Sequence, residues 1–180
     1  MALTPVSASP SAWVMRFAPL VRPGGTVLDL ACGGGRHARL FLGRGHPVAA
    51  VDRDLSPTEA PGAELIAADL EDNSPWPLPG RTFAAVVVTN YLWRPLFPEL
   101  LRALEPGGVL IVETFARGNE AFGRPRNPDH LLDRGELLTV ATGLGVVAYE
   151  DGIVDGRAVV QRICAVNGAG PLPLPSPFGL

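Results

Sequence analysis

The chain contains no lysine, because all 15 of its basic side chains are arginines. This excludes a reaction that runs through a lysine Schiff base or a lysine general base. Acidic residues outnumber the arginines by 18 to 15, which gives a formal net charge of -3. Surfaces that bind nucleic acid usually carry a basic excess, so the charge balance argues against a nucleic-acid partner.

Cysteine is scarce, and long apolar runs are missing. Cys32 lies in a glycine-rich loop and Cys164 in an apolar segment. Neither belongs to a disulfide framework or to a cluster with zinc-ligand spacing, so we expect no metal site. No apolar run approaches the roughly 20 residues that span a bilayer, and two prolines interrupt a start that carries no arginine. We therefore expect a cytoplasmic protein without a signal peptide or a membrane segment.

The length of 180 residues corresponds to a single domain with one sizeable core. Residues 1–10 are small, polar and interrupted by proline, so we expect a loose segment there. Residues 11–167 are expected to form the domain. The proline-rich tail, residues 168–180, is expected to be an extended appendage.

Apolar runs alternate with helix-like segments along the domain. We expect strands at residues 27–30, 48–51, 63–68, 83–89 and 109–112, and helices at residues 12–20, 36–43, 95–104 and 131–142. A hairpin with strands at residues 145–150 and 158–166 follows. The predicted fold class is α/β: a Rossmann-like, doubly wound, mostly parallel sheet of seven strands with a C-terminal antiparallel hairpin.

The first strand, the glycine loop and the second strand form the most informative stretch. The run Val27–Leu30 leads into Cys32-Gly33-Gly34-Gly35, and the second apolar run stops at Asp52. This is a βαβ unit, which places nucleotide-binding groups at the carboxyl ends of two adjacent strands.

Two classes of cofactor suit such a unit. The pattern Gly33-x-Gly35-x-x-Ala38, with Asp52 beyond it, fits an NAD(P)-dependent oxidoreductase. Asp29, however, would set a negative charge beside a pyrophosphate, whereas an ammonium group would be attracted to it. Asp69 adds an acid that can read an adenine amino group. The segment after residue 112 also leads to a hairpin and not to a second nucleotide-binding half.

Five segments together resemble class I S-adenosylmethionine-dependent methyltransferases. They are VLDLACGGGRHA, AVDRD, AADLED, TNYLWRP and LEPGGVLIVE, in the family's order, and the resemblance extends from about Ser11 to Val166. Within the family, the sequence is most similar to small bacterial enzymes near the tellurite-resistance type. The family often has glycine where Ala31 stands, so the backbone there is expected to approach the cofactor less closely.

The resemblance implies a set of cofactor contacts. Asp29 would hold the methionine ammonium, Asp52 would accept both ribose hydroxyls, and Asp69 with Leu70 would read the adenine edge. Arg36 and His37, at the start of a helix, would suit the methionine carboxylate. The full set is Asp29, Ala31, Gly33, Gly35, Arg36, His37, Asp52, Arg53, Asp69, Leu70 and Asn90.

The expected reaction is an in-line methyl transfer to a small-molecule acceptor, in which the enzyme mainly aligns the reacting atoms. Asn90 and Tyr91 would position the methyl group. An amine or hydroxyl acceptor would need a base, for which Glu113, His130 and Asp129 are candidates. The expected acceptor-binding residues are Tyr91, Arg94, Phe115, Arg117 and Arg124. A regulator that only binds S-adenosylmethionine is a further alternative, and the acceptor and the oligomeric state stay open.

Overall fold

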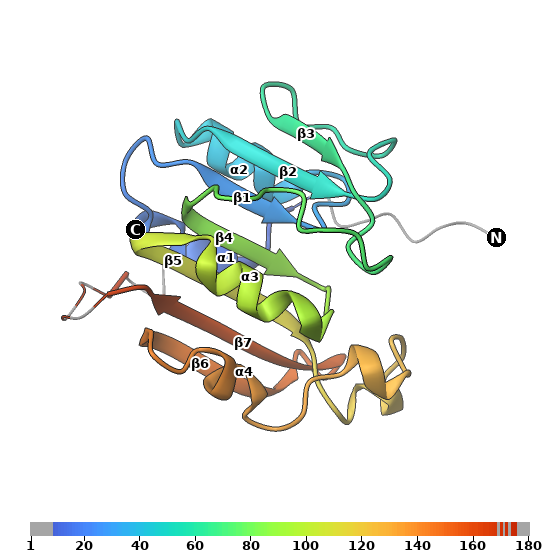
Figure 1. Cartoon of the computed structure of the whole chain (residues 1–180). Helices are drawn as coiled ribbons and strands as arrows, with labels where there is room; N and C mark the ends of the chain where they lie inside the picture. The colour runs from blue at the N-terminus through green and yellow to red at the C-terminus, as the bar shows by residue number, and fades with distance from the viewer. Residues whose placement is uncertain (1–8, 169, 171, 173, 176–180) are drawn as a thin grey trace.

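The computed structural model describes residues 9–168, 170, 172, 174 and 175. These residues form one seven-stranded sheet with the order β3-β2-β1-β4-β5-β7-β6 (Figure 1). The strands are β1 (Val27–Leu30), β2 (Val48–Asp52), β3 (Glu64–Ala67), β4 (Phe83–Thr89), β5 (Leu104–Phe115), β6 (Gly145–Val154) and β7 (Ala158–Val166). The helices are α1 (Ala12–Phe17), α2 (Arg36–Gly43), α3 (Phe97–Arg102) and α4 (Glu136–Val140). Short 3-10 turns are η1 (Ala18–Leu20), η2 (Arg94–Leu96), η3 (Asn119–Ala121) and η4 (Pro128–His130).

The pairing of the strands confirms the predicted fold class. Strands β1 to β5 pair in parallel, and β7 pairs antiparallel with both β5 and β6. The carboxyl ends of the five parallel strands therefore meet at one edge of the sheet, where ligands bind in open α/β sheets.

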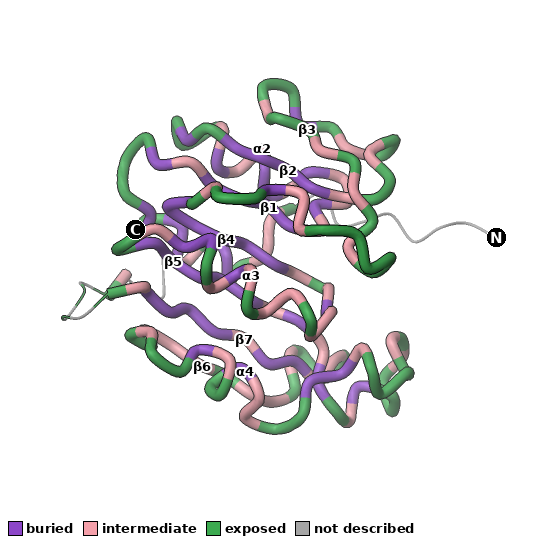
Figure 2. Tube along the Cα trace, in the orientation of Figure 1, coloured by how far each residue is buried: buried purple, intermediate pink, exposed green. Residues whose placement is uncertain are grey.

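Helices cover both faces of the sheet, which makes it doubly wound. Figure 1 shows α3 and α4 in front of the sheet and α1 and α2 behind it. Leu28 and Leu30 of β1 pack into the layer that contains α3 and α4, whereas Val27 packs into the layer of α1 and α2. Because successive side chains of a strand face opposite sides, a strand covered on both faces is apolar throughout, as in β4. The edge strands β3 and β6 are more exposed (Figure 2).

The first helix forms as the sequence predicts. Ser11 caps α1, because its hydroxyl accepts hydrogen bonds from the backbone N–H groups of Trp13 and Val14. The Trp13 indole donates to the carbonyl of Ile163 on β7 at 3.2 Å. This contact fastens the helix across the antiparallel part of the sheet.

The fifth strand starts earlier than predicted. It begins at Leu104 and not at Val109, because Leu104 pairs with Phe83 before a shift in register. The shift takes up the Pro106-Gly107-Gly108 segment, which the sequence predicts as a turn outside the strand. A Cβ at Gly108 would lie 2.8 Å from the carbonyl oxygens of Phe83 and Glu105, so only glycine fits there.

Two boundaries in the C-terminal third also differ from the prediction. The helix predicted at residues 131–142 is only α4, because Leu132 forms an isolated parallel bridge to Ala116 and Gly135 precedes the helix with φ +74°. Strand β6 continues to Val154 and not to Glu150. The hairpin turn is therefore shorter than predicted, with left-handed Asp155 and Gly156.

The chain ends lie mostly outside the described residues. The predictions of a loose segment at residues 1–10 and of an extended tail at residues 168–180 therefore stay predictions, and so does the division at those boundaries. Within the described part of the chain, no helix has the length and apolar character to cross a membrane.

Candidate functional site

A cavity of about 360 Å³ lies where the parallel strands end. Its lining residues come from the ends of β1, β2, β3 and β4, with a histidine added from η4. They are Ala31, Asp52, Arg53, Ala68, Asp69, Leu70, Glu71, Tyr91 and His130. Five predicted cofactor-binding residues are thus brought together: Ala31, Asp52, Arg53, Asp69 and Leu70. Tyr91, predicted as a positioning and acceptor-binding residue, lines the same cavity.

Asp52 joins the end of β2 to the glycine loop. One carboxylate oxygen accepts the N–H of Gly33 at 2.9 Å, and the other accepts the N–H of Asp54 at 3.1 Å. The Thr58 hydroxyl donates to the carbonyl of Gly33 at 2.7 Å. These bonds fix the loop beside the cavity and hold the Asp52 carboxylate at the cavity wall.

The glycine loop uses left-handed backbone at three points. Gly33 and Gly35 have φ values of +50° and +75°. A Cβ at Gly35 would also lie 3.1 Å from the Cβ of Ala60. Ala31 has φ +53°, a conformation that is unfavourable for any residue with a Cβ. The alanine that departs from the family pattern therefore stands where glycine would be unstrained.

Asp29 is buried beneath the loop and does not line the cavity. Its carboxylate accepts the N–H of Ala38 in the first turn of α2 at 2.9 Å. Burial raises the pKa of Asp29 to about 7, and the Ala38 hydrogen bond opposes that shift. A carboxyl so placed stabilises the start of α2 and changes its charge near neutral pH.

His37 is buried on the other side of the same helix turn. Its Nε2 accepts the N–H of Ser11 at 3.1 Å, and its Nδ1 lies 3.4 Å from the hydroxyl of Thr89. Burial, helped by the neighbouring Arg36 charge, lowers the pKa of His37 to about 3. The ring is therefore neutral, and both nitrogens face groups of the protein. The Arg36 guanidinium donates to the carbonyl of Ser9 at 3.4 Å.

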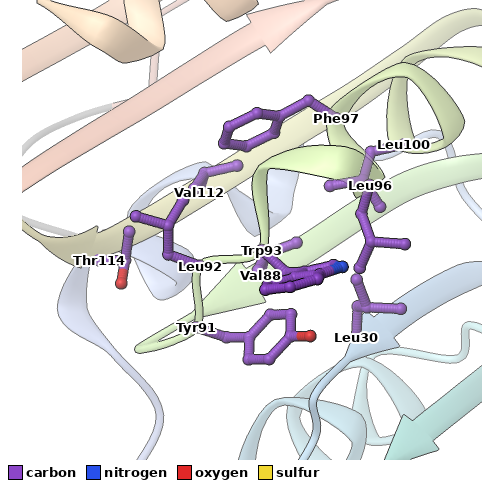
Figure 3. Close-up of a pocket in the computed structure, with 10 residues that line it drawn as sticks. All are labelled: Leu30, Val88, Tyr91, Leu92, Trp93, Leu96, Phe97, Leu100, Val112 and Thr114. Carbon is purple, nitrogen blue, oxygen red and sulfur yellow. The ribbon is translucent and has the colours of Figure 1, made fainter. Parts of the chain in front are cut away.

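Tyr91 separates the main cavity from a second, narrow one. Figure 3 shows its ring beside Trp93 and Val88, in an apolar cavity of about 10 Å³ between β4, β5 and α3. Its hydroxyl is buried and has no hydrogen-bond partner among the described residues. Burial, and the nearby Glu71 carboxylate after it, raise the pKa of Tyr91. Tyr91 thus borders both cavities, and its hydroxyl lies near the Glu71 carboxylate, another residue of the main cavity wall.

Asn90 and Glu113 lie together at the ends of β4 and β5. Asn90 has φ +54°, and its N–H donates to the carbonyl of Glu113 at 2.9 Å. The Glu113 side chain accepts the Ser11 hydroxyl at 2.7 Å and the Arg162 guanidinium at 3.1 Å. Both carboxylate oxygens are thus already engaged. No local pattern in the sequence indicates the contact between Ser11 and Glu113, because the two residues are 102 positions apart.

The predicted acceptor-binding arginines lie away from the cavity wall. Arg94 pairs with Glu136 through two hydrogen bonds of 2.7 and 2.9 Å. Arg117 forms an ion pair with Asp133, and both side chains are more than half exposed. Arg124 and Phe115 also do not belong to the cavity lining. Their predicted contacts with an acceptor stay predictions.

Sequence reasoning missed part of the cavity wall. Ala68 and Glu71 flank the predicted pair Asp69 and Leu70, and the segment AADLED contained the signal for them. His130 was considered only as a base. No local pattern links it to the cavity, because it comes from the connection between β5 and α4.

The sequence profile of a family described as "Methyltransferase domain" matches residues 6–140. The match covers more than half of the chain, so the chain belongs to this family. It is a methyltransferase, which confirms the predicted enzyme class over the oxidoreductase alternative. The predicted cofactor, S-adenosyl-L-methionine, agrees with the solved methyltransferases that follow. Among curated protein sequences, none matches this chain.

Solved structures support the same fold. TehB from Haemophilus influenzae superposes with a TM-score of 0.68 at 14% identity, covering 87% of this chain and 62% of that protein. A TehB-like methyltransferase from Corynebacterium glutamicum gives 0.62 at 20% identity, with 86% of each chain covered. The 1,6-didemethyltoxoflavin-N1-methyltransferase of Burkholderia thailandensis, solved with its substrate and S-adenosylhomocysteine, gives 0.61 at 19% identity, covering 91% and 79%. This chain therefore spans less than two thirds of the Haemophilus protein.

The residues at the strand ends suit this cofactor. The cavity has the size of a small-molecule site, with the carboxylate residue Asp52 at the end of β2 and the aromatic residue Tyr91 just after β4. The loop before α2 is held in a conformation that needs glycine at Gly35. These features would receive a ligand with hydroxyl and purine groups.

Proposed function

We propose that this methyltransferase acts on a small-molecule acceptor and that its cofactor lies in the cavity at the ends of β1 to β4. The observation that carries the proposal is the cavity itself, where Asp52, Asp69 and Leu70 line one space together with Tyr91. A carboxylate that faces ribose hydroxyls and a polar–apolar pair that faces a purine are the groups such a ligand requires.

The adenosine half is the part that the cavity supports best. Asp52 accepts the ribose hydroxyls, Asp69 and Leu70 read the adenine edge, and Arg53 flanks the ring. The methionine half is assigned to the glycine loop and its surroundings, with Asp29 near the ammonium. The remaining predicted members of this half are Ala31, Gly33, Gly35, Arg36, His37 and Asn90.

When bound, S-adenosylmethionine supplies a methyl group on a sulfonium, which an acceptor atom attacks in line with the bond that breaks. The work of the chain is to orient the two partners and to exclude water. Asn90, fixed by its hydrogen bond to the Glu113 carbonyl, and Tyr91 hold the floor beneath the methyl group. Glu113 is a poor candidate for a free base, because Ser11 and Arg162 occupy its carboxylate.

The acceptor is expected on the side of the chain after β4 and β5. Tyr91, Phe115, Arg117 and Arg124 stay the proposed contacts there, and an anionic group on the acceptor would suit the arginines. The proposal of a small molecule is supported by the net charge of -3, because proteins that bind nucleic acid usually carry a basic excess. A cytoplasmic location is also proposed, supported by the two buried thiols of Cys32 and Cys164.

Calorimetric titration with S-adenosylmethionine and S-adenosylhomocysteine, combined with a screen of acceptors, tests the proposal. Thiols, amines and small oxyanions are incubated with the donor, and release of S-adenosylhomocysteine is measured. We expect turnover with at least one small molecule. Tight cofactor binding without turnover across the whole screen would contradict the proposed acceptor class and favour a regulator or a macromolecular acceptor.

A further inference from the structure

His130 enters the cavity from a distant part of the chain. The other residues that line the cavity all lie between Ala31 and Tyr91, at the ends of β1 to β4. His130 ends η4, in the connection between β5 and α4. Residues 126–129 before it are exposed, whereas His130 is only partly exposed. The turn therefore directs its last side chain inward, across the cavity from the strand ends.

Arg94 holds the backbone on both sides of His130. Its guanidinium donates to the carbonyl of Asp129 at 2.9 Å and to the carbonyl of Leu131 at 2.9 Å. The same guanidinium is bound by Glu136 in α4, through Nε and Nη2. The Arg94 guanidinium thus donates four hydrogen bonds, two to the turn and two to α4. These bonds direct the side chain toward the turn and away from the cavity.

The turn is anchored at its ends as well. The Asn127 side chain accepts the N–H of Asp129 at 3.1 Å. After the turn, Leu131 and Leu132 are buried, and the N–H of Leu132 donates to the carbonyl of Phe115 at 3.0 Å. A short segment held at both ends and in the middle presents its side chain in one place, which is what a binding residue requires.

We propose that His130 contacts the adenosine half of the bound cofactor and that Arg94 is the residue that positions it. The inference rests on the proposed function. The adenosine half is chosen because Asp52, Asp69 and Leu70, all assigned to that half, line the cavity together with His130. Of the residues assigned to the methionine half, Ala31 alone belongs to this lining. A flat imidazole packs against a purine and forms a hydrogen bond through either ring nitrogen.

The first test measures binding of S-adenosylhomocysteine and of 5′-methylthioadenosine, which lacks most of the methionine half. His130→Ala is expected to weaken both by a similar factor, about tenfold. Equal affinities of wild type and variant for both ligands would overturn the assignment. A loss for S-adenosylhomocysteine alone would do so too, because it would move the contact to the methionine half.

The second test asks whether Arg94 acts through His130. Arg94→Lys keeps the charge but cannot join two carbonyls and a carboxylate, and it is expected to weaken binding about threefold. In the His130→Ala background, the same change should have no further effect. A full threefold loss in both backgrounds would overturn the positioning role, since a purely structural effect persists without the histidine.

Arg81→Gln serves as the matched control. Arg81 also forms a two-bond pair with a glutamate, Glu64, at 2.9 and 2.8 Å, but it does not belong to the cavity lining. Its variant should bind as wild type does. Absence of any binding by the wild type would overturn the proposed function together with this inference, whereas binding by wild type with unchanged variants would overturn the inference alone.

Discussion

The proposed site has a cofactor half at the ends of β1 to β3 and an acceptor half after β4 and β5, and the two halves are held together in different ways. At the ends of β1 and β2, the bonds join neighbours in the chain: Asp29 to Ala38 across 9 residues, and Asp52 to Gly33 across 19. At the ends of β4 and β5, the bonds join distant segments. Ser11 reaches Glu113 across 102 residues, and Trp13 reaches Ile163 across 150.

This difference explains why the residues of the cofactor half can be predicted from the sequence more completely than those of the acceptor half. A βαβ unit sets its own geometry, because a strand, a glycine turn and a helix N-terminus follow each other directly. The acceptor half has no such unit. Its side chains are positioned by the packing of α1 against β5 and β7 and by the connection beyond β5, which brings His130 to the cavity.

The largest effect is expected from removal of the Asp52 carboxylate, which links the end of β2 to the glycine loop. Asp52→Ala should weaken S-adenosylhomocysteine binding at least about 100-fold, because charge-assisted hydrogen bonds to the ribose and the Gly33 contact are lost together. Calorimetry gives the affinity, and a thermal melt verifies folding. Asp54→Ala is the control, since the Asp54 carboxylate binds Ser56 and Asp54 does not belong to the cavity lining. Wild-type affinity in Asp52→Ala would move the ribose site elsewhere.

Two buried groups in the cofactor half give opposite dependences of stability on pH. The folded-state pKa of Asp29, about 7, lies above that of an unfolded chain, so the free energy of unfolding falls as pH rises from about 4 to about 7. The folded-state pKa of His37, about 3, lies below its unfolded value, so stability falls as pH drops from about 6.5 to about 3. Between about pH 4 and 6.5 the two slopes oppose each other.

Substitution of Asp29 or of His37 separates their contributions to the pH dependence of the free energy of unfolding. Relative to wild type, Asp29→Asn should make stability rise more steeply with pH in that window, and His37→Gln should make it rise less or fall. Each change is at most about 1.4 kcal/mol per pH unit. Urea unfolding at several pH values measures it. Slopes identical to wild type in both variants would show that neither group is buried as described.

In the acceptor half, Glu113→Gln tests whether the distant contacts stabilise the fold. The pair with Arg162 is mostly buried, with 16% and 21% of the two side chains exposed, so the loss should be about 1–2 kcal/mol. Affinity for S-adenosylhomocysteine should stay near wild type, because the Asn90 bond uses only the backbone of Glu113. Glu64→Gln, in the more exposed pair with Arg81, should lose under about 1 kcal/mol. A large fall in affinity would mean that the two halves are coupled.

The smallest expected effect concerns the strained alanine of the glycine loop. Ala31→Gly should raise the free energy of unfolding by about 0.5 kcal/mol, because relief of the left-handed conformation exceeds the added entropy of the unfolded chain. Ala60→Gly is a control for which the opposite change in stability is expected, since Ala60 is buried and does not have a positive φ. That variant should lose stability. A destabilised Ala31→Gly would argue that the methyl group makes contacts that outweigh the strain.

Much of the fold can be predicted from the sequence, because the patterns that indicate strands and helix starts lie within short stretches of the chain. Apolar runs marked every strand, and Ser11 marked the start of α1. The errors fell where long-range pairing overrides a local signal. Pro106-Gly107-Gly108 is a turn by composition, but its pairing draws it into β5. Leu131 and Leu132 fit a helix period, but they are buried in extended chain beside Ala116.

The sequence by itself determined which acids stand at the strand ends, because strand, loop and helix are adjacent in the chain, and it predicts that a methyl donor binds there. Only the tertiary structure decided how the other side chains are used. It places Ser11 within hydrogen-bonding distance of His37 and Glu113. It also directs Arg94 to the carbonyls of Asp129 and Leu131 and brings His130 to the cavity. Such contacts depend on the packing of segments many residues apart, and no periodicity in the sequence records them.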